Sequence, residues 1–126
     1  LTRSGITSRE ESTMYKSGDV LLVKFHPGYG SEIKKYRPAL VISDATEKVD
    51  ARFVLIAPIT TQASKKKHSL ELELIHCPFL KKKSYALLWY PFTIDTQRVQ
   101  YTLGHIPSSA MQSVQKKLHL LLTSSF

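Results

Sequence analysis

Two short apolar runs separated by a long polar loop, within residues 18–43, constrain the fold more than any other feature of the sequence. The runs span residues 20–25 and 38–43, are rich in β-branched side chains, and are bounded by turn-forming residues. Runs of this length and composition predict β-strands rather than buried helices. Connections longer than a hairpin needs are usually functional or disordered. The stretch therefore predicts two strands joined by a loop that carries function.

The loop between these runs is basic and ends in an arginine. Arg37 immediately precedes Pro38, and the residue before a proline is restricted to extended geometry. Its guanidinium is therefore expected on a rigid element, as a functional site requires. A solvated basic loop with an arginine at the start of a strand is the alternative, and composition does not decide between the two. The other polar residues of the loop that we consider are His26, Ser31, Glu32, Lys34 and Lys35.

The rest of the chain predicts further short strands and one terminal helix. Strands are expected at residues 53–59, 70–75, 85–90 and 99–103, with Pro58 ending or bulging the first of these. Residues 44–52 are expected to form a loop or one helical turn, and residues 93–98 are polar. From Ser108 onward, an apolar stripe at helical spacing predicts a core-facing helix, and its members are Met111, Val114, Leu118 and Leu121. Five or six strands with one helix predict a mainly β fold, a small curled antiparallel sheet or barrel with a C-terminal helix.

Length and cysteine content set broad limits. A chain of 126 residues is expected to form one domain with a core of its own. We expect residues 1–13 to be a tag or a disordered extension and residues 14–126 to be a single domain. The one cysteine, Cys77, excludes a disulfide framework within the chain and suits a reducing compartment. No apolar run is long enough to span a membrane and no signal peptide is recognisable, so a cytoplasmic protein is expected.

The net charge of +8 points to an acidic partner. Lysine runs at residues 65–67 and 81–83 fall in predicted connections between strands, as does the Lys34-Lys35 pair. If these connections cluster, they form an electropositive groove suited to phosphates. Aromatic residues near them suit stacking on unpaired bases, and these are Tyr29, Tyr36, Tyr85, Trp89 and Tyr90. Lysine runs that only keep the loops soluble are the alternative.

No glycine-rich phosphate loop, serine-nucleophile elbow or paired metal-ligand motif is present. We expect no metal and no other cofactor. Metal-free acid–base chemistry remains open through Glu32, Arg37, His26 and nearby hydroxyl groups. Cleavage of RNA needs little more: a base for the 2′-hydroxyl proton, a cation for the phosphorane charge, and an acid for the leaving 5′-oxygen.

Three motifs resemble the signatures of MazF/PemK-type toxins. The first joins Gly18-Asp19, His26-Pro27, Gly30-Ser31-Glu32 and the run from Arg37 to Ser43. The second is the run from Ala57 through Thr60 to Gln62, and the third is Thr93-Ile94-Asp95 followed by Arg98. They occur in the family's order and spacing, and with the terminal helix they cover about residues 15–122. The third departs from the pattern, because Trp89, Tyr90 and Phe92 stand where many members carry an acidic residue, a glutamine and an arginine.

The resemblance implies an SH3-like barrel with a C-terminal helix, a homodimer, and a toxin of a type II toxin–antitoxin system that regulates growth. It implies an endoribonuclease that cuts single-stranded mRNA at short motifs, independently of metal and ribosomes, leaving 2′,3′-cyclic phosphate and 5′-hydroxyl ends. It also implies a cognate acidic antitoxin as partner, with DNA binding in its company.

Residue roles follow from matching positions. Arg37 would stabilise transition-state charge, with proton donation as a second possible role, and Thr60 would hold the scissile phosphate. Glu32 would be the general base, unless it only pairs with a neighbouring lysine. His26 would replace or assist Glu32, or be structural. The expected RNA-binding residues are His26, Ser31, Lys34, Lys35, Thr61, Gln62, Lys65, Lys66, Lys81 and Lys82. The alternatives are a catalytically degenerate module of the same fold that binds RNA or an antitoxin, and a CcdB-like toxin acting on DNA gyrase through its terminal helix.

Overall fold

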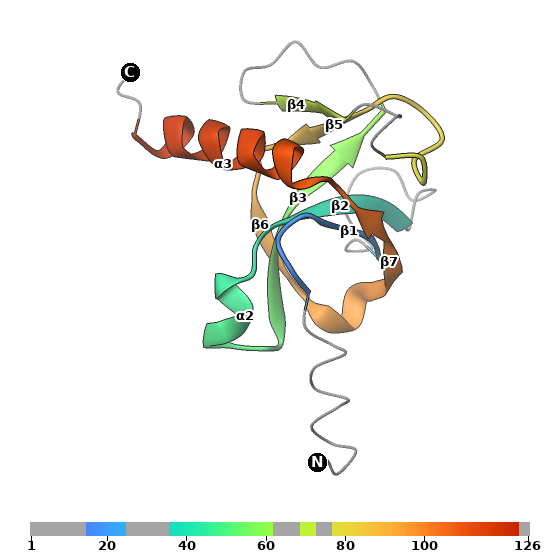
Figure 1. Ribbon diagram of the computed structural model, residues 1–126. Coiled ribbons are helices and arrows are strands. Elements are labelled where there is room, and N and C mark those ends of the chain that lie inside the picture. The colour runs from blue at the N-terminus through green and yellow to red at the C-terminus, as the bar shows by residue number, and fades with distance from the viewer. Residues whose placement is uncertain (1–14, 25–35, 62–68, 73–76, 124–126) are drawn as a thin grey trace.

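A computed structural model of the chain describes residues 15–24, 36–61, 69–72 and 77–123. The strands are β1 (Asp19–Lys24), β2 (Tyr36–Ser43), β3 (Phe53–Thr60), β4 (Ser69–Leu72), β5 (Ser84–Leu87), β6 (Phe92–Asp95) and β7 (Val99–His105). The helices are α2 (Ala45–Val49), the short 3-10 helix η1 (Thr96–Arg98) and α3 (Ser108–Thr123). As predicted, the fold is a curled antiparallel sheet with a C-terminal helix (Figure 1).

Strand β3 lies at the centre of the sheet and pairs with three other strands. The strand order is β4-β5-β3-β2-β1-β7, with β6 also paired to β3. One edge of β3 pairs with β2, while its other edge pairs first with β6 over residues 53–56 and then with β5 over residues 59–60. The prediction that Pro58 ends or bulges this strand was wrong, because β3 continues through Thr60. Pro58 instead forms the last pair with β2, opposite Ala39.

Two apolar clusters hold the two faces of the curled sheet. In the first cluster, Met111 and Val114 of α3 pack together with fully buried Leu40 of β2 and Leu88, which follows β5. Three of the four residues of the predicted stripe therefore face the core, with Leu118 at the edge of this cluster, whereas Leu121 is half-buried and does not belong to it. The second cluster comprises Leu21, Val23, Ala39, Val41, Val54, Ile56 and Ile94. Alternation along β1, β2 and β3 separates the two clusters, because successive side chains of a strand point to opposite faces.

Hydrogen bonds fix the beginning of the fold at two points. Gly18 has a φ of +96°, in the left-handed region, which suits the turn that leads into β1. Its N–H donates to the carbonyl of Val41 at 2.8 Å, and its carbonyl accepts from the N–H of Ile106 at 2.9 Å. Nearby, the N–H of Tyr15 donates to both carboxylate oxygens of Glu47 on α2, at 3.1 and 3.0 Å. Among the described helices, none is long and apolar enough to cross a membrane.

Several predicted boundaries were wrong for physical reasons. The strand predicted at 85–90 ends at Leu87, because the chain turns through Leu88 and Tyr90, whose N–H groups donate to the carbonyls of Ala86 and Leu87. Strand β6 lies in a segment expected to be merely polar, since its outward threonine and aspartate mask the inward Phe92 and Ile94. Strand β7 runs past Gly104 to His105. The remaining strands extend one or two residues beyond prediction, and residues 45–49 take the helical turn that was one of the two alternatives for this segment. The predictions for residue 25 and for residues 73–75 lie outside the described residues.

Candidate functional site

The candidate site lies where β2 and β3 stop pairing. The last pair joins Ala39 to Pro58, and Arg37 and Thr60 each lie two residues beyond it, at the same end of the paired segment. On the opposite edge of β3, Ile59 and Thr60 pair with β5 (Figure 1). Arg37 and Thr60 therefore lie on neighbouring strands, at the end where the pairing of β2 with β3 stops.

Arg37 is carried on a paired strand at the rim of a buried cluster. It lies opposite Val23 of β1, which is fully buried, and it alternates with buried Ala39 and Val41. Arg37 itself is half-buried. A cation at the edge of an apolar cluster acts through a lower effective dielectric than one in bulk water, so its attraction for an anion is stronger. Its position in β2 matches the prediction that the residue before Pro38 is extended.

Thr60 is paired with a tyrosine of β5. The register places Thr60 directly opposite Tyr85 of β5, and partners in an antiparallel pair present their side chains on the same face. Both residues are half-buried. Thr61 follows at once as an exposed residue outside the strand. Sequence reasoning considered Tyr85 only as a stacking residue, because strand register cannot be read from composition.

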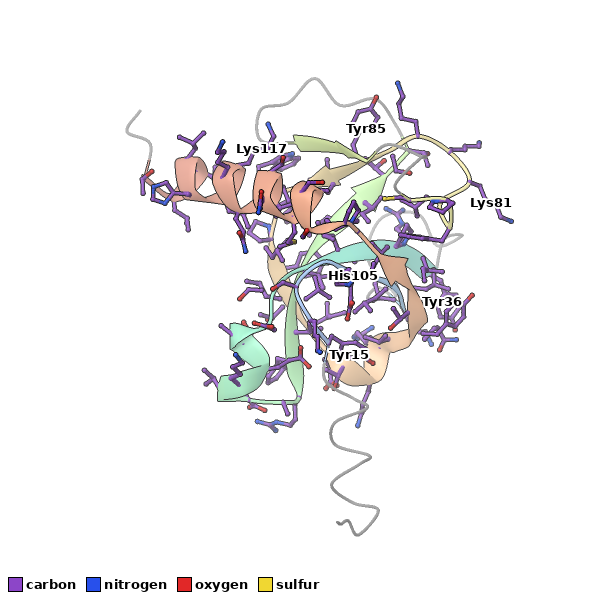
Figure 2. All side chains as sticks on the ribbon, viewed as in Figure 1. Tyr15, Tyr36, Lys81, Tyr85, His105 and Lys117 are labelled. Carbon is purple, nitrogen blue, oxygen red and sulfur yellow. The ribbon has the colours of Figure 1, made fainter. Side chains whose placement is uncertain are left out.

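The lysine run at residues 81–83 lies in a loop that is fixed at its base. Cys77 and Leu80 are buried in the first cluster, and the N–H of Leu80 donates to the carbonyl of Cys77 at 2.9 Å. The hydroxyl of buried Ser84 donates to the carbonyl of Lys82 at 2.8 Å. The three lysines are exposed, and Lys81 projects from the surface in Figure 2. Burial raises the pKa of the Cys77 thiol, which keeps it protonated and unsuited to nucleophilic chemistry.

The aromatic ring of Phe79 packs the loop against β7. A Cβ atom added to Gly104 would lie 2.4 Å from two ring carbons of Phe79, so the ring rests directly on the Gly104 backbone. The absence of a side chain at Gly104 therefore allows the loop to approach β7. This contact determines where the exposed lysines are held, and nothing in the sequence pattern points to it.

Two more cationic side chains lie at the end of β1. Lys24 is exposed and pairs in register with Tyr36. Arg98, in η1, donates from Nη1 to the carbonyl of Lys24 at 3.2 Å. Arg98 belongs to the third sequence motif, but sequence reasoning gave it no role. The structure thus adds a positive group at the end of the sheet where β2 begins.

The predicted site residues divide into two sets. Arg37, Thr60, Thr61, Lys81 and Lys82 are described, and they lie at β2, at the end of β3 and in the loop before β5. The others lie outside the residues that the structure describes, and they are His26, Ser31, Glu32, Lys34, Lys35, Gln62, Lys65 and Lys66. Their predicted roles stay predictions.

The three residues that depart from the third motif form a packed aromatic series. The rings of Trp89 and Tyr90 stack with centroids 5.5 Å apart and an interplanar angle of 16°. Tyr90 and Phe92 have centroids 5.6 Å apart and are tilted by 43°. Phe92 lies opposite Ile56, near the middle of β3, and packs against the second cluster. These residues therefore have packing roles on the edge of β3 opposite to β2.

Comparison with known proteins defines the class. The chain belongs to the family of PemK-like, MazF-like toxins of type II toxin–antitoxin systems, whose model matches residues 16–122. That span includes every strand and nearly all of α3. The expected family and fold class are thereby confirmed.

Three relatives illustrate the similarity. An endoribonuclease MazF of Staphylococcus saprophyticus is 29% identical over 110 residues, which cover 86% of this chain and 92% of that protein. The MazE–MazF crystal structure from Deinococcus radiodurans has a TM-score of 0.69 at 23% identity, covering 89% of this chain and 99% of the other. An endoribonuclease of a mycobacterial species, solved in complex with its cognate antitoxin, has a TM-score of 0.69 at 17% identity, covering 89% and 98%. At these identities the structural likeness supports the fold.

Proposed function

We propose that this protein is the toxin of a type II toxin–antitoxin pair and cuts single-stranded mRNA in the cytoplasm, at short sequence motifs and without ribosomes. Family membership supports the toxin class and the endoribonuclease activity. The observation that carries the site is the position of Arg37 and Thr60 on neighbouring strands, each two residues beyond the last pair of β2 with β3 and at the same end. Exposed lysines of the loop before β5 add the positive charge that an RNA backbone requires.

The proposed reaction is an internal transfer of the phosphate. The 2′-oxygen attacks the neighbouring phosphorus, the bond to the 5′-oxygen breaks, and the products carry a 2′,3′-cyclic phosphate and a 5′-hydroxyl. A base removes the 2′-hydroxyl proton and an acid returns a proton to the leaving oxygen, so that no proton is lost overall.

Each proposed catalytic residue has a distinct part in this reaction. Arg37 stabilises the extra negative charge on the phosphorane, as a preorganised cation does most effectively. The Thr60 hydroxyl donates to a non-bridging phosphate oxygen. Glu32, five residues before Arg37 in the sequence, is proposed as the base on the strength of the motif that it matches.

The proposed macromolecular partners are RNA, a second copy of the chain, and an acidic antitoxin. The Deinococcus radiodurans MazF was solved with MazE, and the mycobacterial endoribonuclease with its cognate antitoxin. The net charge of +8 on this chain complements an acidic antitoxin segment and an RNA backbone equally well. An antitoxin that occupies the lysine loop would therefore compete with RNA.

The test is cleavage of a long single-stranded RNA by the purified protein in EDTA, without ribosomes. Arg37→Ala is expected to slow cleavage by about 10²- to 10³-fold, the usual cost of removing a preorganised electrostatic group. Arg52→Ala is the matched control, since Arg52 is 76% exposed and pairs with Asp50 at the far end of β3. End mapping should show 5′-hydroxyl ends in the wild-type products.

Two results would contradict the proposal. Cleavage by Arg37→Ala at the wild-type rate would remove Arg37 from the reaction. Intact RNA after incubation with folded, antitoxin-free wild-type protein would favour the catalytically degenerate binding module. In that case the aromatic series of Trp89, Tyr90 and Phe92 would be the first substitutions to examine, since they replace polar groups of many relatives.

A further inference from the structure

One face of the three strands β2, β1 and β7 carries exposed aromatic and cationic side chains together. Tyr36 is opposite Lys24, and Leu22 is opposite both Pro38 and Tyr101. Register partners share a face, as do alternate residues of one strand. These five residues, which we call the tyrosine face, therefore lie on one side of the sheet: Leu22, Lys24, Tyr36, Pro38 and Tyr101.

The tyrosine face is more exposed than the rest of the same side of the sheet. Tyr36 is 41% and Tyr101 is 58% exposed, whereas Val20 and Leu40, on the same side of the same strands, are fully buried beneath the first cluster. Leu22 and Pro38 are half-buried between the two tyrosines. The apolar side of the sheet thus continues beyond its covered part and ends in two tyrosine rings.

Positive charge surrounds these rings. Lys24 lies on the tyrosine face itself, and Arg98 is bonded to the carbonyl of Lys24. At the other end, Gly104 shares this side of β7, and the Phe79 ring upon it holds the lysine loop there. In the view of Figure 2, Lys81 and Tyr36 lie on the same side of the molecule.

We propose that the tyrosine face is a stacking platform for the unpaired bases of single-stranded RNA. Exposed aromatic rings on a sheet, flanked by cations, are the arrangement that binds single strands: bases stack on the rings while lysines and arginines contact the phosphates. A strand spacing of about 4.8 Å and a rise of about 3.3 Å per residue place the two tyrosines roughly 12 Å apart. Two bases of the same strand can therefore stack on them together.

This inference extends the proposed function, and rests on it for the identity of the ligand. Arg37 follows Tyr36 in the chain but points to the other face of β2, since successive residues alternate. The platform would therefore hold RNA flanking the cut, and would contribute affinity with little preference for sequence. An isolated hydrophobic patch would favour a protein partner, but the flanking lysines and arginine favour a polyanion with planar groups.

The experiment measures binding of a fluorescein-labelled 2′-O-methyl oligouridylate, which lacks the reactive hydroxyl and cannot be cut. Tyr36→Ala and Tyr101→Ala are each expected to weaken binding by about 5- to 100-fold, the range for one lost stacking contact. Tyr36→Phe and Tyr101→Phe should retain wild-type affinity, because the ring remains. Lys81→Ala should lower the slope of log affinity against log salt by about 0.7, whereas Lys48→Ala, on α2, should not.

The outcomes separate this inference from the proposed function. Alanine variants that bind as well as wild type, or wild-type protein that does not bind the oligonucleotide, would overturn the platform even if RNA is cleaved. A changed oligomeric state of Tyr101→Ala in light scattering would also overturn it, by showing an interface between copies. Weakened binding in the alanine variants, with no cleavage by wild type, would support the platform while refuting the nuclease.

Discussion

Replacement of Gly104 by alanine tests how the lysine loop is held. The new Cβ would lie 2.4 Å from two ring carbons of Phe79 and 2.9 Å from a third. Carbon atoms prefer separations of about 3.5–4.0 Å, so the ring must retreat by roughly 1 Å or more. The backbone of Gly104 lies outside the left-handed region, and the cost is therefore steric. Overpacking of this kind costs about 1–3 kcal/mol of stability.

The assay is urea unfolding followed by the fluorescence of Trp89, the single tryptophan of the chain. Each kcal/mol lost should also lower Tm by about 4 °C in a domain of this size. The salt dependence of RNA binding should fall in parallel, because the loop that carries the lysines is displaced.

A double-mutant cycle with Phe79→Ala isolates the contact. Once the ring is absent, Gly104→Ala has little to collide with, so the double variant should be more stable than the sum of the single losses predicts, by about the 1–3 kcal/mol of overpacking. Additive losses, or a Gly104→Ala variant as stable as wild type, would refute the idea that this contact positions the loop.

Two further predictions concern the stability of the fold. Burial raises the pKa of the Glu47 carboxyl, and this residue is only 3% exposed. The native state therefore binds the carboxyl proton more tightly than the unfolded chain does. As a result, the free energy of unfolding should fall as pH rises from about 4.3. Glu47→Gln keeps an acceptor for the N–H of Tyr15 and should flatten this dependence between pH 4 and 8; an unchanged slope in denaturant titrations would contradict the assignment. Val114→Ala, at a fully buried position of α3, should cost about 1–3 kcal/mol by the same titration, whereas Gln115→Ala, exposed on the same helix, should cost little.

The sequence predicted the class of fold because its strongest patterns are local. Alternation, β-branched runs and turn residues identified most strands, and the stripe containing Met111 and Val114 identified α3. Strand β6 was missed because half of its residues are polar, and the end of β5 was misplaced because the aromatic residues after it resemble a continuing strand. Such errors arise where tertiary pairing, rather than local preference, decides the structure.

The candidate site could be predicted only in part, for a related reason. The residue before Pro38 has a local restriction, so the extended backbone of Arg37 was predictable. The approach of β5 to Thr60 depends on β3 changing partners from β6 to β5 along one edge, and the position of the lysine loop depends on a ring packed against Gly104. The exposed pair of Leu120 and Leu122 near the end of α3 was likewise not expected from the sequence. Register and contacts between distant segments have no local signature.

The pairing of β1 with β7 has a consequence for synthesis of the protein. The first strand, at residues 19–24, finds its outer neighbour only in the last strand, at residues 99–105, and Gly18 is bonded to Ile106 just beyond it. Closure of so long a loop makes folding slow and dependent on contacts that form late. A nascent chain therefore cannot complete its sheet until nearly all of it has left the ribosome. Products that end before β7 would lack the strand that pairs with the outer edge of β1, so we expect only chains that extend through β7 to fold and to act as the proposed nuclease.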